Sequence, residues 1–512
     1  MNSISESISK LARSALIIFL GTVVSRLLGL FGEIIIVRSL PPHVYGHIAL
    51  AYTIIALISQ ISLVGLRDSV VRFLSSTEKT YKKHDIIRSG YTLSLVISVI
   101  ICIFLYETRA IISGVFNNKE LVMLLPLLLP YLIFHPIAKV SFAILQSEGK
   151  SIEALISRHL VPRTIGVFLL ITMIALQQAT YGAVLFWISF PLFTLILSLY
   201  YIDNIVGLKK VLDGFPSLSQ MKALLSFSWP LATGSIILLL LARTDILMIG
   251  YFLNSKQVGI YRSVQPLRQI VDISLVAFSF IFFPLATKYF ENNKINRLET
   301  IYVSSAKWAS IIIFPILLTI ILFSKEIILI LFTPDYIRAA PVISILLSGL
   351  FFRTLVGLNG DLIRAIDRPK VELISSIFGF ISNLLLNLLL IPNFGIIGAA
   401  IGTVVGFGIY NLTEVIYIWI ILDIHPFSRN TIIPLIVTSG VATCTWFLFN
   451  EHQFGIGGIV VISGVFYFVQ LVSIFATYSV DDEDIYLLTE VENKMNREFR
   501  FIRTLLQKYN KQ

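Results

Sequence analysis

Long apolar stretches recur along almost the whole of this 512-residue chain and restrict it to the folds that a lipid bilayer permits. A transmembrane helix needs about 20 consecutive, mostly apolar residues, and several stretches approach or exceed this length. Only 14% of the residues are charged, whereas an average soluble protein has about 25%. We therefore predict an all-α polytopic membrane protein in which the spans pack laterally into a bundle.

The connections between the apolar stretches alternate in charge. Those after the second, fourth, sixth, eighth and tenth stretches carry Lys and Arg, and the intervening ones are poor in both. By the positive-inside rule, this places both termini in the cytoplasm and requires an even number of spans. It also accounts for the net charge of +10 without a nucleic-acid partner. Hydropathy predicts about fourteen spans: 14–38, 47–72, 87–106, 121–146, 155–176, 181–202, 225–252, 258–286, 302–323, 341–364, 371–391, 396–422, 431–449 and 457–478.

The first six spans resemble the next six. The segment GEIIIVRSLPPHVYGHI (32–48) matches TDILMIGYFLNSKQVGI (244–260), so Glu33 corresponds to Asp245, and two later segments match at a similar offset of roughly 212 to 219 residues. An even number of spans per copy makes the copies parallel, and substrates commonly bind between such halves. The predicted parts are two six-helix lobes, an appended helix pair and a cytoplasmic basic amphipathic tail: 1–210, 211–425, 426–480 and 481–512.

Three segments resemble one known family. SRLLGLFGEIIIVRSLPPHVYG, VGIYRSVQPL and IPNFGIIGAAIGTVVGFGIYN are similar to signatures of the polysaccharide transporter and oligosaccharide flippase family, within the multidrug/oligosaccharidyl-lipid/polysaccharide (MOP) flippase superfamily. The resemblance covers essentially the whole chain. It implies two six-helix lobes around a central cavity, and movement of a lipid-linked sugar across the membrane. Many relatives have a basic residue just before the acid of the first span, where this chain has Gly32.

Charged residues within the predicted spans are the candidate functional residues. A charge at the bilayer centre costs about 2.5–3.5 kcal/mol on insertion scales, so such residues tend to face a protein interior or a water-filled cavity. Guanidinium groups match phosphate oxygens with their fork of donors. We predict that four arginines line a cavity and bind the phosphate of a lipid-linked sugar: Arg26, Arg243, Arg262 and Arg268. We predict that three acids position the arginines or couple movement to an ion: Glu33, Asp245 and Asp272.

Structural interpretations remain open for these residues. Arg26 with Glu33, and Arg243 with Asp245, also fit internal pairs that only permit insertion. Gly21, Ser25 and Gly29 recur every four residues in the first span, a pattern that permits close contact with another helix. The basic amphipathic tail fits either a helix on the inner leaflet or a solvated helix.

The sequence favours a flippase in the cell membrane that moves a phosphate- or pyrophosphate-linked oligosaccharide by alternating access. The alternatives are a cation-coupled multidrug exporter of the same superfamily, a lipid II-type flippase, and a membrane glycosyltransferase or sugar polymerase. The arginine excess argues against the exporter, and the short external connections argue against an enzyme. We expect no cofactor and no metal. The expected partners are the lipid-linked oligosaccharide, membrane lipids and glycan-assembly enzymes, with the chain itself a monomer and no nucleic acid bound.

Overall fold

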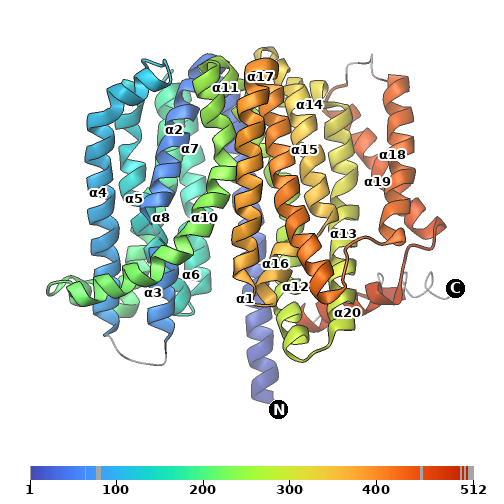
Figure 1. The fold of residues 1–512 in the computed structure, drawn as a ribbon, viewed down its shortest axis with the longest axis horizontal. Helices are drawn as coiled ribbons and strands as arrows, with labels where there is room; N and C mark the ends of the chain where they lie inside the picture. Colours follow the sequence, from blue (N-terminus) through green and yellow to red (C-terminus); the bar gives the residue numbers. More distant parts are fainter. Residues whose placement is uncertain are drawn as a thin grey trace. The chain divides into compact units, whose positions relative to one another are not determined.

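A computed structural model of the chain shows helices throughout the described ranges, with no strand among them (Figure 1). In lipid, an α-helix satisfies every backbone hydrogen bond within its own segment, which is why apolar stretches of this length form helices. The structure describes residues 2–63, 65–76, 82–449, 452, 454–495, 499–500 and 503–504.

The chain divides into two compact units, Ile17–Ser263 (the first unit) and Val264–Gln512 together with Met1–Leu16 (the second unit). The division does not fall at residue 210, between the predicted lobes, because α10 packs against α2, α3 and α4. The two lobes, 1–210 and 211–425, therefore stay a prediction from the repeat.

The first unit holds the following helices, with α1 entering it at Ile17: α1 (Asn2–Ser39), α2 (Pro42–Ser62), α3 (Leu66–Ser75), α4 (Lys83–Val115), α5 (Leu121–Ser147), α6 (Ser151–Leu155), the π-helix η1 (Ile156–Leu160), α7 (Val161–Ala175), α8 (Ala179–Val206), α9 (Leu208–Leu212), α10 (Leu218–Phe252) and α11 (Ser255–Val264). Within this unit α5 lies centrally, since it packs against α2, α3, α4 and α8. Outward-facing apolar side chains of α4, such as Ile100 and Phe104, are more than half exposed and suit contact with lipid.

The second unit holds the 3₁₀-helix η2 (Gln265–Arg268), α12 (Gln269–Glu291), α13 (Ile295–Leu322), α14 (Ser324–Leu331), the 3₁₀-helix η3 (Pro334–Ala339), α15 (Ala340–Leu355), α16 (Asn359–Ala365), α17 (Pro369–Leu422), α18 (Arg429–Phe449), α19 (Ile456–Ala476) and α20 (Asp482–Met495). Here α13 is central. It packs against α12 and α15 on one hand, and against the appended helices α18 and α19 on the other.

Twelve helical segments among the described residues are long and apolar enough to cross a membrane. One of them, the 54-residue α17, bends at Gly395 and covers two of the predicted spans, 371–391 and 396–422. The predicted first span lies in α1, which is not among the twelve. The chain is thus a multi-pass helical membrane protein. The count of fourteen spans and the cytoplasmic placement of both termini stay predictions.

Two glycines, one from each copy of the repeat, meet within the first unit. A Cβ on Gly46 of α2 would lie 1.7 Å from the carbonyl oxygen of Ser255, and a Cβ on Gly259 of α11 would lie 1.9 Å from that of Pro42. The contact is reciprocal, because Gly46 and Gly259 are 213 residues apart, and so are Pro42 and Ser255. A side chain at either glycine would force the two backbones apart, so the helices approach this closely only because both residues are glycine.

We expect Gly259→Ala to lower the thermal denaturation midpoint of the purified protein clearly. The new methyl group would overlap backbone atoms, which cannot rotate away, and overpacking typically costs about 1–3 kcal/mol. Gly114→Ala in α4 is the matched control, since no atom lies within 4 Å of its added methyl group. Equal midpoints for the two variants would contradict the close contact between α2 and α11.

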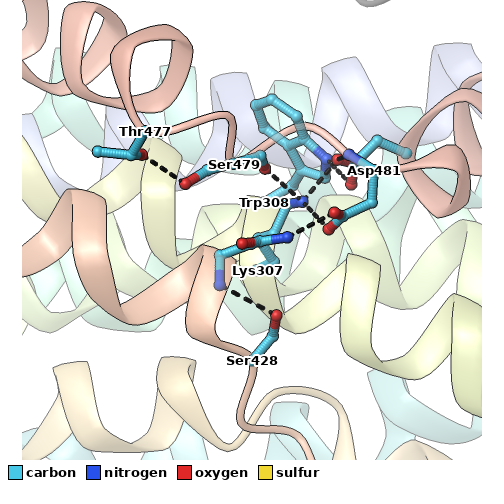
Figure 2. A network of polar contacts seen from close by, with 8 residues as sticks. Lys307, Trp308, Ser428, Thr477, Ser479 and Asp481 are labelled. Carbon is cyan, nitrogen blue, oxygen red and sulfur yellow. Dashed lines mark hydrogen bonds and ion pairs between the residues drawn. The ribbon is translucent and has the colours of Figure 1, made fainter. Parts of the chain in front are cut away.

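In the second unit, a buried lysine joins α13 to the segment after α19 and to α20 (Figure 2). The Lys307 ammonium donates to the carbonyl of Ser479 at 2.9 Å, to Asp481 at 3.1 Å and to Asp484 at 2.5 Å. Its side chain is 2% exposed, and that of Asp484 is fully buried. Trp308 donates to the second oxygen of Asp484 at 2.8 Å. All three ammonium donors are therefore satisfied, which a buried charge requires.

The same network holds the first part of the predicted tail. Asn430, at the start of α18, donates to Asp481, while Ile485 and Leu488 of α20 pack against an apolar cluster that includes Ile311 of α13. The described part of the tail thus packs on the protein. Its placement on the inner leaflet stays a prediction, and several of its predicted basic positions, among them 497 and 508, lie outside the described residues.

Candidate functional site

Close packing of α1 against the helices of predicted spans five and six positions the first charged residues. A Cβ on Gly21 would lie 2.6 Å from the side chain of Leu155, and one on Gly29 would lie 3.4 Å from the guanidinium of Arg163. The glycine row predicted from the sequence therefore lies against a helix, and that helix is the α6–η1–α7 span. Gly32 packs on the ring of Phe186, 2.4 Å from where a Cβ would stand. An arginine at position 32 would need this buried ring to move.

Glu33 is buried and binds three donors from three other helices. Its Oε1 accepts a hydrogen bond from Trp187 Nε1 of α8 at 3.0 Å and forms a salt bridge with Arg262 Nη2 of α11 at 3.1 Å. Its Oε2 accepts from the Tyr45 hydroxyl of α2 at 3.3 Å. Arg262 is only 6% exposed. A buried ion pair of this kind is stable only while both partners and their extra hydrogen bonds are present.

The second acid of the matched pair binds the residue next to Arg262. The Tyr261 hydroxyl donates to Asp245 Oδ2 at 2.6 Å, and the N–H of Ile246 donates to Asp245 Oδ1 at 2.8 Å. Consecutive residues of α11 therefore hold the two acids that the repeat relates, since Tyr261 binds Asp245 and Arg262 binds Glu33. This link joins α1, α10 and α11.

An aromatic group adjoins Glu33. The rings of Tyr52 and Trp187 are stacked with centroids 4.2 Å apart, and Tyr131 meets Tyr52 edge to face at 5.4 Å. His135 stacks on Tyr131 and shares a hydrogen bond with Ser59. Stacked aromatic pairs contribute about 0.5–1.5 kcal/mol beyond their buried area and hold the rings in one orientation. Trp187 thereby presents its indole N–H to Glu33.

The four predicted arginines differ in their surroundings. Arg26 and Arg243 of the first unit are half-buried, and neither forms an ion pair with any described residue. Arg262 is neutralised by Glu33. Arg268 belongs to the second unit, where its guanidinium lies over the Phe407 ring, 5.5 Å from the ring centroid, and donates a hydrogen bond to Gln265 at 2.8 Å. Substrate binding by these residues stays a prediction.

The third predicted acid, Asp272, forms a half-exposed salt bridge with Arg353 of α15 at 3.1 Å in the second unit. A second polar group in this unit joins α16 to α17. Asn359 of α16 donates to Glu414 at 2.7 Å and to Asn411 at 3.2 Å, both in α17. Glu414 is fully buried, so its amide partner offsets part of the cost of burial.

Sequence reasoning missed Tyr45 and Trp187 as partners of Glu33. Aromatic residues make up 12% of the chain, so no composition signal singles these two out. His47 contacts Asn118 Oδ1 at 2.7 Å and Ser255 Oγ at 3.0 Å. No group of three or more potential metal ligands occurs among the described residues.

The helical architecture matches solved transporter structures. The fold aligns with that of the lipid II flippase MurJ in an inward closed conformation at a TM-score of 0.72 and 16% identity, covering 90% of this chain and 99% of MurJ. It also aligns with an inward-facing multidrug resistance MATE family transporter of the MOP superfamily at a TM-score of 0.66 and 16% identity, covering 80% of this chain and 98% of the transporter. The chain therefore shares the fold of these two transporters.

A family model described as polysaccharide biosynthesis protein matches residues 35–341, and the chain belongs to this family. It is a multi-pass protein of the cell membrane. Over 214 residues it is 25% identical to the probable low-salt glycan biosynthesis flippase Agl15 of Haloferax volcanii, covering 41% of this chain and 45% of Agl15. Over 291 residues it is 22% identical to the teichuronic acid biosynthesis protein TuaB of Bacillus subtilis, covering 55% of this chain and 57% of TuaB.

A further relative is an uncharacterized membrane protein of Methanocaldococcus jannaschii, 26% identical over 296 residues, covering 56% of this chain and 58% of the relative. The matches thus cover 45% to 58% of the length of these three curated relatives.

Proposed function

We propose that this protein is a flippase that moves a phosphate- or diphosphate-linked oligosaccharide lipid across the cell membrane by alternating access, for the assembly of a polysaccharide or glycan. The observation that carries the proposal is the salt bridge between Glu33 of α1 and Arg262 of α11. These helices belong to different copies of the repeat. An ion pair and a glycine contact between the copies suit a link that opens and closes as the copies move relative to each other.

The substrate class rests on the family and on charge. Relatives named for glycan biosynthesis and teichuronic acid biosynthesis support a glycan lipid as the substrate. Arginines that pair with no carboxylate of the described ranges, such as Arg26 and Arg243, suit the phosphate of such a lipid better than a cationic drug. The proposed activity is transport without covalent chemistry. We infer that the chain works as a monomer and passes its substrate to glycan-assembly enzymes.

We expect Arg268→Gln to reduce export of the lipid-linked glycan by about 10- to 100-fold, since charge-assisted hydrogen bonds contribute about 1.5–3 kcal/mol. Arg268 pairs with no carboxylate among the described residues, so the variant should still insert and fold. The measurement is the lipid-linked glycan left on the inner face in a strain that lacks the native protein. Arg109→Gln, an exposed arginine that stacks on Tyr106, is the control.

The same strain tests the proposed function itself. Deletion should cause a lipid-linked sugar to accumulate on the inner face, and the wild-type protein should clear it. If no such lipid accumulates and the deletion instead sensitises cells to cationic dyes, the protein is a drug exporter. Full export by Arg268→Gln would show that Arg268 does not bind the substrate, and it would leave the proposed function unchanged.

A further inference from the structure

Predicted span five contains a turn of π-helix that carries basic residues. In η1, backbone hydrogen bonds reach back five residues, and Pro162, which has no N–H to donate, lies two residues beyond its end. Such single π-turns inside α-helices are rare and occur frequently at functional sites. Arg158 and His159 lie in this turn, and Arg163 lies in the first turn of α7. The irregular backbone therefore coincides with three basic side chains.

Cations from other helices, Arg26, Arg67 and Lys139, lie near these residues. His159 interacts electrostatically with Arg26 of α1, Lys139 of α5, Arg158 and Arg163. Arg158 and Arg163 also repel each other, as do Lys139 and Arg158. We call Arg26, Lys139, Arg158 and Arg163 the basic cluster. All four residues are partly exposed.

The basic cluster has no paired counter-charge in the part of the chain that the structure describes. Within the described residues of the first unit, none of its members forms a salt bridge. Glu33 attracts Arg163, but its oxygens already bind Arg262, Trp187 and Tyr45. Asp68 attracts Lys139, but its carboxylate forms its salt bridge with Arg67. Two donor atoms of the cluster, Arg26 Nη1 and Arg163 Nε, are buried without a hydrogen-bond partner. Uncompensated charges and unsatisfied donors within a membrane span are costly, and such residues usually mark a substrate pathway.

Aromatic rings hold the two span-five guanidinium groups in place. The Arg158 guanidinium lies over the Phe142 ring at 4.4 Å, and that of Arg163 lies over the Phe190 ring at 4.5 Å. Gly29 of α1 leaves the space that the Arg163 guanidinium fills. A guanidinium stacked on an aromatic face keeps the donors at its edge available, and these donors match the oxygens of phosphate.

We propose that the basic cluster of Arg26, Lys139, Arg158 and Arg163 binds the phosphate or diphosphate group of a lipid. The proposal rests on the proposed function where it identifies that group as the diphosphate of the transported glycan lipid. It differs from the arginines predicted from the sequence, because three of the four ligands lie on spans four and five. Arg262, in contrast, is already neutralised by Glu33.

Binding of farnesyl diphosphate to the purified full-length protein in zwitterionic nanodiscs tests the site. We expect isothermal titration calorimetry to show binding by the wild type and about 10- to 100-fold weaker binding by Arg158→Gln and by Arg163→Gln, since each loses charge-assisted hydrogen bonds. Arg72→Gln is the matched control, because Arg72 also stacks on a phenylalanine, Phe227, at 4.1 Å, but lies outside the cluster. Unchanged affinity in both cluster variants and in their double variant would overturn the proposal.

Thermal stability without ligand provides a second readout. Removing one of several mutually repelling cations should raise the denaturation midpoint of Arg158→Gln while farnesyl diphosphate loses its stabilising effect. A purely structural arginine would show a lower midpoint instead. Lower midpoints together with wild-type affinity would assign the cluster to folding and contradict the site.

Nanodiscs containing phosphatidylglycerol distinguish the two sources of the phosphate group. If phosphatidylglycerol weakens farnesyl diphosphate binding by the wild type but has no such effect on the cluster variants, a lipid headgroup binds the same site. The proposal that the cluster binds a lipid phosphate is then retained. Export of the glycan lipid by a variant that no longer binds the diphosphate would overturn this site and leave the proposed function intact. Diphosphate binding by a protein that exports no glycan lipid would retain the site and overturn the function.

Discussion

Asp484→Ala is expected to destabilise the protein by about 3–5 kcal/mol, because it removes one counter-charge and leaves the buried Lys307 ammonium undercompensated. The variant also leaves the Trp308 N–H without its acceptor and loses a link between α20 and α13. The expected observation is a large fall in the thermal denaturation midpoint of the purified protein. Protease sensitivity of the tail should rise with it, since α20 loses its hydrogen bonds to Lys307 and Trp308 of α13.

Two controls distinguish the loss of this ion pair from a nonspecific effect of the substitution on stability. Asp68→Ala removes a carboxylate from an exposed pair with Arg67 and should change stability by no more than about 1 kcal/mol. In the double variant Lys307→Met, Asp484→Ala, an apolar side chain replaces the charge, so much of the stability should return. A double variant as unstable as Asp484→Ala would show that Lys307 is not the reason for the loss.

Glu33→Ala is expected to abolish transport and to cost about 3–5 kcal/mol of stability, since Arg262 would remain buried without its counter-charge. The indole N–H of Trp187 would lose its acceptor as well. Transport is measured as clearance of the lipid-linked glycan in the deletion strain. Stability is measured as the denaturation midpoint in detergent.

The neutral double variant Glu33→Gln, Arg262→Gln distinguishes an ion pair that breaks and re-forms during transport from one that only stabilises the fold. It removes both charges but keeps side chains that can hydrogen-bond, so stability should largely recover. We expect transport to stay low, because the link between the repeat copies would no longer have the strength of an ion pair. Full recovery of transport would show that the pair only permits folding.

Several features of the fold follow from local sequence. Apolar stretches of span length predict helices because a bilayer offers no partner for an open backbone. The glycines of α1 predicted a close helix contact, and Gly21 and Gly29 make one. The repeat predicted that Gly46 and Gly259 occupy equivalent places, and the structure brings them into reciprocal contact. These signals lie within one or two turns of one helix, or in a repeated pattern, and can therefore be read from the chain.

The pairing of charges could not be read in the same way. Lys307 was not predicted to form a buried ion pair. A single lysine in an apolar span, with the acidic segment DDED (481–484) much later in the chain, was the signal that could have indicated it. The basic residues of η1 were visible, but nothing local indicated that Lys139 and Arg26 would join them. The Glu33–Arg262 pair joins residues 229 positions apart.

The sequence by itself determined the membrane class, the approximate spans, the matched acids Glu33 and Asp245 and the excess of positive charge. Only the tertiary structure decided which charges neutralise each other, with Arg262 bound to Glu33 and the basic cluster without a paired acid among the described residues. The physical reason is that helix formation in lipid depends on the composition of one segment, whereas electrostatic energy depends on distances between segments and on their burial.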